Sequence, residues 1–438
     1  MSDQRRRSDL VSDQTSESDL VSDQTSESDL VSDQTSENEP YLEGVRVLDF
    51  TQYLAGPACT RLLTEMGADV IKVEMTPYGD PQRSGVPRKN KRSGGFVQQN
   101  RGKRSLAVDL SRPEGVAVVK ELIPHVDVVV ENYSTGVMER RGMGYDELSA
   151  INPRLIMASI SGFGQTGPLT HKPAFDFIAQ AYSGLMHMTG DPEGPPTFTG
   201  IALGDNNAGF HAFAGLGYAL YRRDRTGKGT HIDISMVEAL FHMQETAVHS
   251  ASMDPSYEAV RGGRHYGPLS PAGVFQGPEG WIVILCTQMQ IGGLWEAMER
   301  PEFAEDPRFA DPLPRIENRE ALTAEIEDWM QSHATDVDVL AKLEASRVPC
   351  APVLDPTDAV NHPFFTERRA VREVDDPLTG PIIVPGFPIK FADAPPEPDL
   401  VTHALGQDNE DVLRDILGYD DDRIAALAAD GLIATKEH

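Results

Sequence analysis

The chain has little cysteine and no long apolar run. Its three cysteines, Cys59, Cys286 and Cys350, lie far apart among 438 residues and form no CxxC spacing. We therefore expect neither a disulfide framework nor a zinc site, and the histidines show no metal-ligand spacing either. A bilayer-spanning helix needs about 18 or more consecutive apolar residues, and no such run occurs. We expect a cytoplasmic protein without a membrane partner.

Basic residues are also scarce. The sequence has 39 lysines and arginines, only 10 of them lysines, against 68 acidic residues, so that the net charge is −29. This charge disfavours nucleic acid and anionic membranes as partners. Because the acid excess is spread over the whole chain, we expect a surface adapted to concentrated salt, with an ordinary acidic enzyme as the alternative.

The first 40 residues differ in composition from the rest. The sequence SDLVSDQTSE of residues 8–17 recurs at 18–27 and 28–37. Each repeat holds too few apolar residues to bury a core. We therefore expect a disordered acidic tail over residues 1–40.

From Tyr41 onward, strand-like and helix-like segments alternate. Buried-strand patterns lie at 45–50, 68–74, 105–110, 126–132 and 154–164, and a helical pattern lies at 113–125. Such alternation predicts an α/β protein in which helices cover both faces of a parallel sheet, a Rossmann-like layout.

Shifts in composition suggest how the chain is divided. A glycine-rich segment begins near residue 261, helical patterns fill much of 290–347, and proline becomes frequent after residue 350. We expect the first part of a large Rossmann-like domain over 41–230. A linker and a smaller central domain would occupy 231–350, and 351–438 would return to the large domain.

Two acids lie in a turn-rich stretch between helical patterns. Gly190, Pro192 and Gly194 leave little room for regular structure, so Asp191 and Glu193 are expected on a stiff loop. A carboxylate there could attack an acyl thioester and form a mixed anhydride. The released thiolate could then return to give an enzyme-bound thioester, which conserves the free energy of the bond. A solvated acidic turn is the alternative reading of this loop.

Five long blocks carry a recognisable pattern. They are LEGVRVLDFTQYLAGPACTRLLTEMGADVIKVE (42–74), KRSLAVDLSRPEG (103–115), DVVVENYSTGVMERRGMGYDELSAINPRLIMASISGFGQTGP (127–168), FDFIAQAYSGLMHMTGDPEGPP (175–196) and RTGKGTHIDISMVEAL (225–240). Their sequence and order resemble the family III CoA-transferases, which include formyl-CoA transferase, carnitine CoA-transferase and acyl-CoA racemases. The resemblance implies transfer of CoA between an acyl-CoA and a free carboxylic acid by an interlocked homodimer. It implies coenzyme A as a co-substrate, with no metal and no tightly bound cofactor.

The resemblance also suggests catalytic residues. It implies that the nucleophile is the acid just before Gly-Pro-Pro, which is Glu193 here in place of an aspartate, so Asp191 stays open as the alternative. Asp176 matches an aspartate that racemases use for proton transfer. A histidine precedes that aspartate in the racemases, whereas Phe175 precedes Asp176 here. We therefore expect Asp176 to be structural or to cap a helix, and a racemase is the alternative function.

Eight positions match residues that contact CoA in the family. They are Leu54, Ala55, Met75, Val108, Leu110, Asn132, Tyr133 and Arg140. Met75 stands where many members have an arginine, so we expect a less cationic site than usual. Arg83, Arg88 and Lys89 could compensate for the missing charge, or they could simply be solvated loop residues.

The segment RGGRHYG at 261–267 matches a glycine-rich loop that closes over the reactive intermediate. Arg261, Arg264 and His265 are then candidates to hold a second carboxylate of the acceptor acid. A merely flexible surface loop is the alternative. The acidic composition and this possible carboxylate clamp favour small dicarboxylic acids as substrates, and the resemblance to salt-adapted members of the family implies succinyl-CoA as donor and mesaconate as acceptor. A non-catalytic CoA-binding protein is a third possibility.

Overall fold

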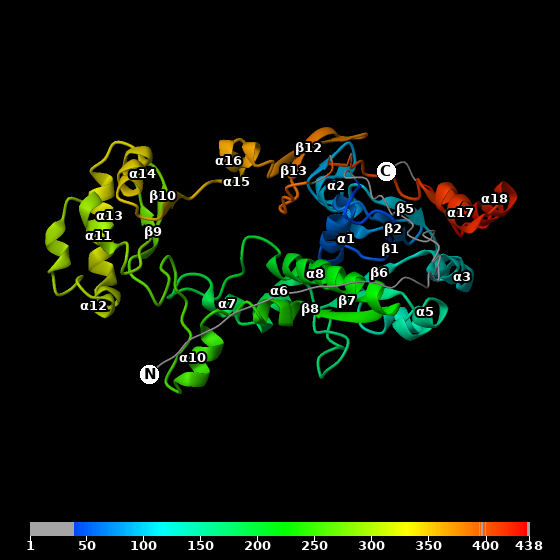
Figure 1. Ribbon diagram of the computed structural model, residues 1–438, viewed down its shortest axis with the longest axis horizontal. Helices are drawn as coiled ribbons and strands as arrows, with labels where there is room; N and C mark the ends of the chain where they lie inside the picture. The colour runs from blue at the N-terminus through cyan, green and yellow to red at the C-terminus, as the bar shows by residue number, and fades with distance from the viewer. Residues whose placement is uncertain (1–38, 394, 396, 399, 436–438) are drawn as a thin grey trace, which may run out of the picture.

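The computed structural model describes residues 39–435 except 394, 396 and 399. The expected disordered tail over 1–40 lies outside the described residues, apart from Glu39 and Pro40. A large α/β domain occupies one end of the structure and a smaller domain the other, and two extended stretches of chain connect them (Figure 1). Among the described residues, no helix is both long enough and apolar enough to cross a bilayer.

A parallel sheet of six strands forms the centre of the large domain, in the order β5-β2-β1-β6-β7-β8. The strands are β1 (Arg46–Asp49), β2 (Asp69–Glu74), β5 (Arg104–Ala107), β6 (Val128–Glu131), β7 (Ile156–Ser161) and β8 (Thr230–Ser235). Numbered along the chain within this sheet, the order is the 3-2-1-4-5-6 arrangement of the dinucleotide-binding Rossmann fold. The expected α/β, Rossmann-like class is confirmed.

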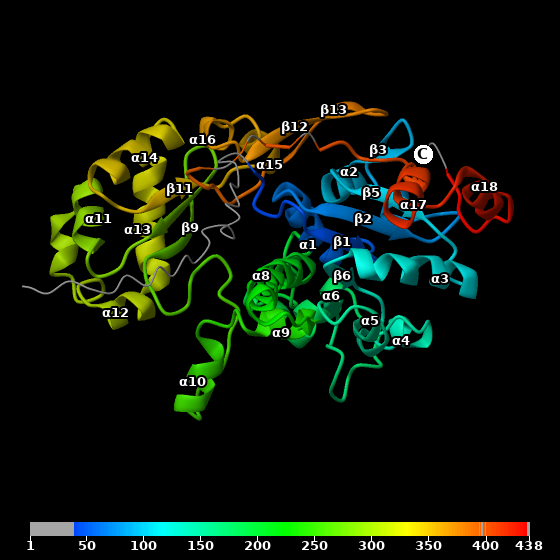
Figure 2. The ribbon, with the colours of Figure 1, turned by 45° about the vertical axis from the view of Figure 1, so that its right-hand side comes forward.

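Helices cover both faces of this sheet (Figure 2). On one face lie α1 (Ala55–Glu65), α6 (Asp176–Tyr182), α8 (Leu203–Thr226) and α9 (Met236–Phe241). On the other lie α3 (Pro113–Leu122), α4 (Val137–Arg140), α5 (Tyr145–Ile151), α17 (Asn409–Leu417) and α18 (Asp421–Ala429). Shorter elements around the sheet are β3 (Arg88–Lys89), β4 (Arg92–Ser93), α2 (Gly94–Asn100) and α7 (Leu185–Met188).

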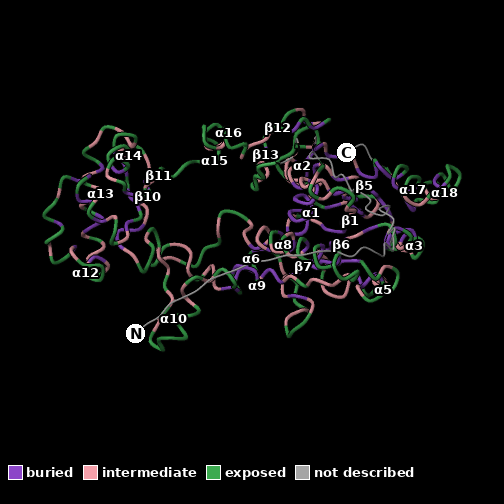
Figure 3. Tube along the Cα trace, viewed as in Figure 1, coloured by how far each residue is buried: buried purple, intermediate pink, exposed green. Residues whose placement is uncertain are grey.

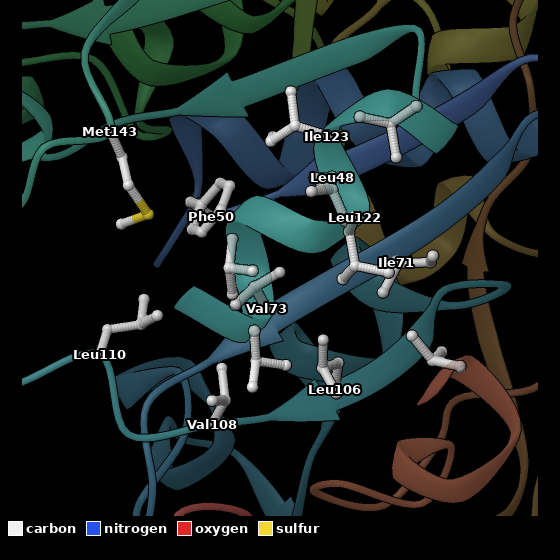
Figure 4. Packing of buried hydrophobic residues seen from close by; sticks show 14 of the residues in the cluster. Leu48, Phe50, Ile71, Val73, Leu106, Val108, Leu110, Leu122, Ile123 and Met143 are labelled. Atoms are coloured by element: carbon white, nitrogen blue, oxygen red, sulfur yellow. The ribbon is translucent and has the colours of Figure 1, made fainter. Parts of the chain in front are cut away.

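The central strands carry consecutive apolar residues, such as Val128, Val129 and Val130 of β6, because helices cover both faces of the sheet. Charged residues of the strands, among them Lys72 and Glu74 of β2, are buried as well. In β1, Val47 packs toward α1 and α8, and Leu48 packs toward α3. Figure 4 shows the second of these two cores, in which Phe50, Val73 and Leu122 pack together. Burial of each such side chain contributes about 1.5–3 kcal/mol to the free energy of folding, so the two cores together hold the sheet firmly in place.

The small domain has its own antiparallel sheet, in the order β11-β10-β9. Its strands and helices are β9 (Ala272–Gln276), β10 (Trp281–Leu285), α11 (Ile291–Ala297), α12 (Pro312–Glu317), α13 (Arg319–Gln331), α14 (Asp336–Ala345) and β11 (Cys350–Pro352). The expected boundary at residue 231 falls inside β8 of the large sheet, and the helix α9 that follows also packs on that sheet. Because β11 pairs with β10, the return begins after Pro352.

The connecting stretches hold α10 (Ala247–Met253), α15 (Pro356–Ala359), α16 (Pro363–Glu367) and the hairpin of β12 (Val371–Asp376) and β13 (Gly380–Pro385). Figure 3 shows that buried residues gather inside the two domains and that much of the connecting chain is exposed. The C-terminal segment then joins the large domain. The Asp408 carboxylate accepts a hydrogen bond of 2.7 Å from the Ser105 amide, and Val108 forms a bridge with Ile433.

Candidate active site

A cavity of about 580 Å³ lies at the carboxyl ends of β1 and β6, where the strand order reverses. In open α/β sheets this switch point is the usual place for a ligand. Five of the eight expected CoA contacts line the cavity, namely Leu54, Ala55, Asn132, Tyr133 and Arg140. The tertiary structure therefore brings together residues from two distant blocks of the sequence.

The turn between β1 and α1 forms one wall of the cavity. The Gln52 amide donates to Asn132 Oδ1 over 2.7 Å, and Asn132 Nδ2 donates to the Gln52 carbonyl over 2.8 Å. Asn132 therefore supports the turn. The next residue, Tyr53, has a φ of +61°, in the left-handed region that few non-glycine residues adopt. Its ring lies edge-on to Phe175, with centroids 5.9 Å apart, and both aromatic residues line the cavity.

The other three expected CoA contacts lie outside the cavity lining. Val108 and Leu110 are 0% and 2% exposed and belong to the core on the α3 face, and Met75 packs against that core. Arg141 connects Met75 to the cavity wall, since its Nη2 lies 3.6 Å from the Met75 sulfur and its guanidinium 5.4 Å from the Tyr133 ring. Met75 therefore contacts the residue behind Tyr133, whereas Val108 and Leu110 belong to the core against which Tyr133 packs.

The cations that could replace the missing arginine have different surroundings. The Arg83 guanidinium pairs with buried Glu74 at 2.6 and 2.8 Å and lies 4.0 Å from the ring centre of Phe96. Its charge is therefore already matched within the protein. Arg88 and Lys89 form the exposed strand β3.

Asp205, in the first turn of α8, lines the same cavity. Among the residues that the structure describes, none donates a hydrogen bond to its carboxylate. Burial, and then the charge of neighbouring Asp176, raise the pKa of Asp205 to about 7. The cavity is thus lined by a carboxyl group that accepts no hydrogen bond from the described residues. This group titrates near neutral pH. The sequence alone does not single out Asp205, because an acid at the start of a helix suggests capping.

Asp176 is fixed by three donors. Its carboxylate accepts from the amides of Gly204, at 2.6 Å, and Asp205, at 3.2 Å, and from Gln180 Nε2 at 2.6 Å. It is only 5% exposed. These bonds satisfy amides that the first turn of α8 leaves without helical partners, so Asp176 anchors the helix that carries Asp205. This geometry does not favour a proton-carrying role for Asp176.

The two acids of the turn-rich loop are exposed and do not line this cavity. Asp191 Oδ1 accepts from the Glu193 amide over 2.9 Å, which closes an Asx turn. Asp191 instead borders a second cavity of about 560 Å³, shared with Gly262, Gly263 and His265. The acidic loop and the glycine-rich loop therefore lie against each other.

The arginines of the glycine-rich loop are bound to the protein itself. Arg261 Nε donates to the Asp191 carbonyl over 3.0 Å, and Nη1 donates to the His187 carbonyl over 3.3 Å. Arg264 pairs with Glu327. Within the described part of the chain, His265 Nε2 has no hydrogen-bond partner, and burial lowers the pKa of this histidine. Arg261 and Arg264 therefore each contact protein groups, and His265 contributes a buried ring nitrogen without a partner among the described residues.

Comparison with known proteins identifies the family. Residues 42–409 match the family described as CoA-transferase family III. The chain is 37% identical over 400 residues to succinyl-CoA–D-citramalate CoA-transferase of Chloroflexus aurantiacus, a match that covers 90% of this chain and 98% of that one. It is 40% identical over 372 residues to succinyl-CoA:mesaconate CoA-transferase of Haloarcula hispanica, covering 82% and 91%.

A solved structure matches as well. The crystal structure of a CaiB/BaiF family protein from Brucella suis superposes with a TM-score of 0.76 at 32% sequence identity, and the match covers 86% of this chain and all of that one. The sequence match, the fold and the cavity at the switch point lead to the same assignment. The protein is an enzyme that belongs to CoA-transferase family III.

Proposed function

We propose that the enzyme moves CoA from succinyl-CoA to a small dicarboxylic acid and that Asp205 is the carboxylate that becomes acylated. One observation carries the choice of residue: Asp205 lines the cavity that also holds Leu54, Ala55, Asn132 and Tyr133, the expected CoA contacts. Its carboxylate has no donor among the described residues, and its pKa of about 7 leaves it ionised at slightly alkaline pH.

The first half of the reaction would form an enzyme thioester. The Asp205 carboxylate attacks the thioester carbonyl of succinyl-CoA, the carbon–sulfur bond breaks, and CoA leaves as a thiolate. The thiolate then attacks the Asp205 carbonyl of the mixed anhydride. Succinate departs, and CoA is now bonded to Asp205.

The second half repeats these steps with the acceptor. A carboxylate of the acceptor attacks the Asp205 thioester, and the CoA thiolate leaves again. The thiolate attacks the acceptor carbonyl of the new anhydride, which releases the acceptor CoA thioester and restores the Asp205 carboxylate. No water takes part, so the free energy of the thioester is kept throughout.

The substrate class rests on the relatives. Two of them are named for succinyl-CoA as donor and for D-citramalate or mesaconate as acceptor, and both acceptors are dicarboxylic acids. The acidic surface, with a net charge of −29, supports the further proposal that the enzyme works in concentrated salt.

We also propose a homodimer, because apolar side chains are exposed along one helix. Phe210, Tyr218 and Tyr221 of α8 are 47%, 78% and 64% exposed. Their spacing places them on one face of the helix, and clustered exposed aromatic residues are typical of protein interfaces.

Trapping tests the nucleophile directly. The enzyme is incubated with succinyl-CoA, treated with hydroxylamine, and the modified residue is located by mass spectrometry, in high and low salt. We expect a hydroxamate at Asp205, and Asp205→Asn should lower kcat by at least about a thousandfold. Glu193→Gln and Asp191→Asn are the matched controls and should keep most of the activity.

The other outcomes are equally informative. A hydroxamate at Glu193 or Asp191, with loss of activity in those variants, would transfer the nucleophilic role to the turn-rich loop. Deuterium exchange at the α-carbon of an acyl-CoA without any adduct would indicate the racemase instead. Neither adduct nor exchange would leave a CoA-binding protein without catalysis.

A further inference from the structure

Nearly every backbone polar group of the turn at residues 51–53 is hydrogen-bonded to a side chain of the large domain. The Thr51 amide donates to Asp49 Oδ1 over 2.8 Å, and Lys72 Nζ donates to the Thr51 carbonyl over 2.7 Å. The Tyr53 amide donates to Asp80 Oδ1 over 3.1 Å. Together with the Asn132 bonds to Gln52, these contacts hold a turn that lines the CoA cavity.

Two of these side chains form a buried ion pair. Lys72 Nζ lies 3.0 Å from Asp80 Oδ2, and the side chains are 2% and 0% exposed. Lys72 is in the interior of β2, beside Asp49 of β1 in the strand register. Lys103 Nζ completes the cluster at 2.9 Å from Asp49 Oδ2. Two lysines and two aspartates are therefore buried directly beneath the turn.

Stability alone does not explain a charged pair at this position. Removing two charges from water costs several kcal/mol per ion, and apolar residues of similar volume usually serve a core equally well. What the pair adds is a fixed position for the Thr51 carbonyl and the Tyr53 amide. Tyr53 needs such support, because its positive φ costs about 1–3 kcal/mol that the surroundings must offset.

We propose that Lys72 and Asp80 are positioning residues, which hold the turn at 51–54 in the shape that binds the CoA portion of the substrate. Neither residue lines the cavity, and both act through Thr51 and Tyr53. The proposal rests on the proposed function, since it requires CoA to occupy this cavity. It predicts that loss of the pair weakens CoA binding more than binding of the acceptor acid.

The test measures binding of coenzyme A by calorimetry and KM for both substrates. The double variant Lys72→Met/Asp80→Leu removes the pair without leaving one buried charge alone. We expect CoA to bind at least tenfold more weakly and KM for succinyl-CoA to rise, while KM for mesaconate stays within about twofold. The nearly isosteric Asp80→Asn keeps an oxygen for the Tyr53 amide and should lose less affinity than Asp80→Leu.

A second buried ion pair provides the matched control. Arg92 and Asp376 are 5% and 0% exposed, lie 3.0 Å apart and join β4 to β12, away from the cavity. The double variant Arg92→Met/Asp376→Leu should lower the melting temperature and leave CoA affinity unchanged.

Three results separate the possibilities. If the folded Lys72/Asp80 variants bind CoA as the wild type does, or if the control pair weakens CoA binding equally, the positioning role is wrong. Should the double variant fail to fold, the comparison of Asp80→Asn with Asp80→Leu decides. The positioning role is then wrong if the two single variants bind CoA equally well. A wild-type enzyme that binds no CoA would instead refute the proposed function itself.

Discussion

At the scale of single residues, the reactivity proposed for Asp205 comes from its surroundings. Burial raises its pKa first, and the negative charge of Asp176 raises it further, to about 7. An ordinary aspartate, with a pKa of about 3.9, is a weaker nucleophile because its basicity is lower. A carboxylate near pKa 7 is more basic and is still largely ionised above neutral pH, where it could attack a thioester.

This leads to a prediction for the pH profile. Asp205 must be ionised to attack, so kcat/KM should rise with pH through a midpoint near 7 and then level off. Asp176→Asn removes the second cause of the raised pKa, and the midpoint should therefore move to lower pH. Initial rates with succinyl-CoA and mesaconate, from about pH 5.5 to 9, measure both effects.

Glu131 provides the control for this assignment. Burial raises the pKa of Glu131 to about 7 as well, so it could in principle produce the same profile. We expect Glu131→Gln to leave the midpoint in place. If the midpoint disappears in Glu131→Gln and persists in Asp176→Asn without a shift, Asp205 is not the titrating group.

At the scale of elements, the site depends on how closely α8 packs against α1. A Cβ added to Gly209 of α8 would lie 2.6 Å from the Ala55 carbonyl oxygen and 3.0 Å from Ala58 Cβ. Ala55 lines the cavity on α1, and Asp205 lines it on α8. The absence of a side chain at Gly209 therefore sets the distance between the cavity wall at Ala55 and the proposed nucleophile Asp205.

Gly209→Ala should push the two helices apart. We expect it to destabilise the protein by about 1–3 kcal/mol, as overpacking does, and to raise KM for succinyl-CoA several-fold. Gly292→Ala on α11 of the small domain is the control, because nothing lies within 4 Å of the added Cβ. That variant should stabilise the helix by about 0.5–1 kcal/mol and leave KM unchanged. Equal effects of the two variants in denaturant unfolding and kinetics would contradict this account.

At the scale of the whole molecule, the two domains are connected by exposed chain, and α8 presents aromatic residues to solvent. A soluble monomer rarely exposes such a cluster. A second copy of the chain that covers this face would complete the structure and could approach the cavity. The proposed homodimer would thus be part of the active unit.

The dimer can be tested through α8. Tyr218→Glu with Tyr221→Glu places two charges on the exposed face, which should prevent an apolar interface from forming. We expect light scattering to give twice the chain mass for the wild type and the single mass for the variant, with loss of turnover. Leu313→Glu, on α12 of the small domain and 72% exposed, is the control and should remain dimeric. A wild type that stays monomeric at working concentrations would refute the proposed assembly.

The parallel sheet could be predicted because each strand is recognisable from a short, contiguous stretch of sequence. A strand that is covered on both faces carries consecutive apolar residues, as β6 does, and β1 is followed directly in the chain by the helix α1. Leu54 and Asn132 were expected at the CoA site from the resemblance to the family, and the structure explains why they share a cavity. Leu54 lies in the turn after β1 and Asn132 follows β6, and the carboxyl ends of these neighbouring parallel strands meet at one edge of the sheet.

Which acid enters the cavity was decided by tertiary packing. Asp205 lies near Ala55 only because α8 packs on α1 across a long stretch of intervening chain, and Asp176 turns its carboxylate to the start of α8. Likewise, Arg261 donates to the carbonyls of His187 and Asp191 because the His187–Pro192 segment packs beside it. Without that packing its guanidinium would be free to bind a substrate. Local sequence determined the strands and the end of the sheet that binds the ligand. The positions of charged side chains depend on contacts between distant segments, and only the folded chain brings those segments together.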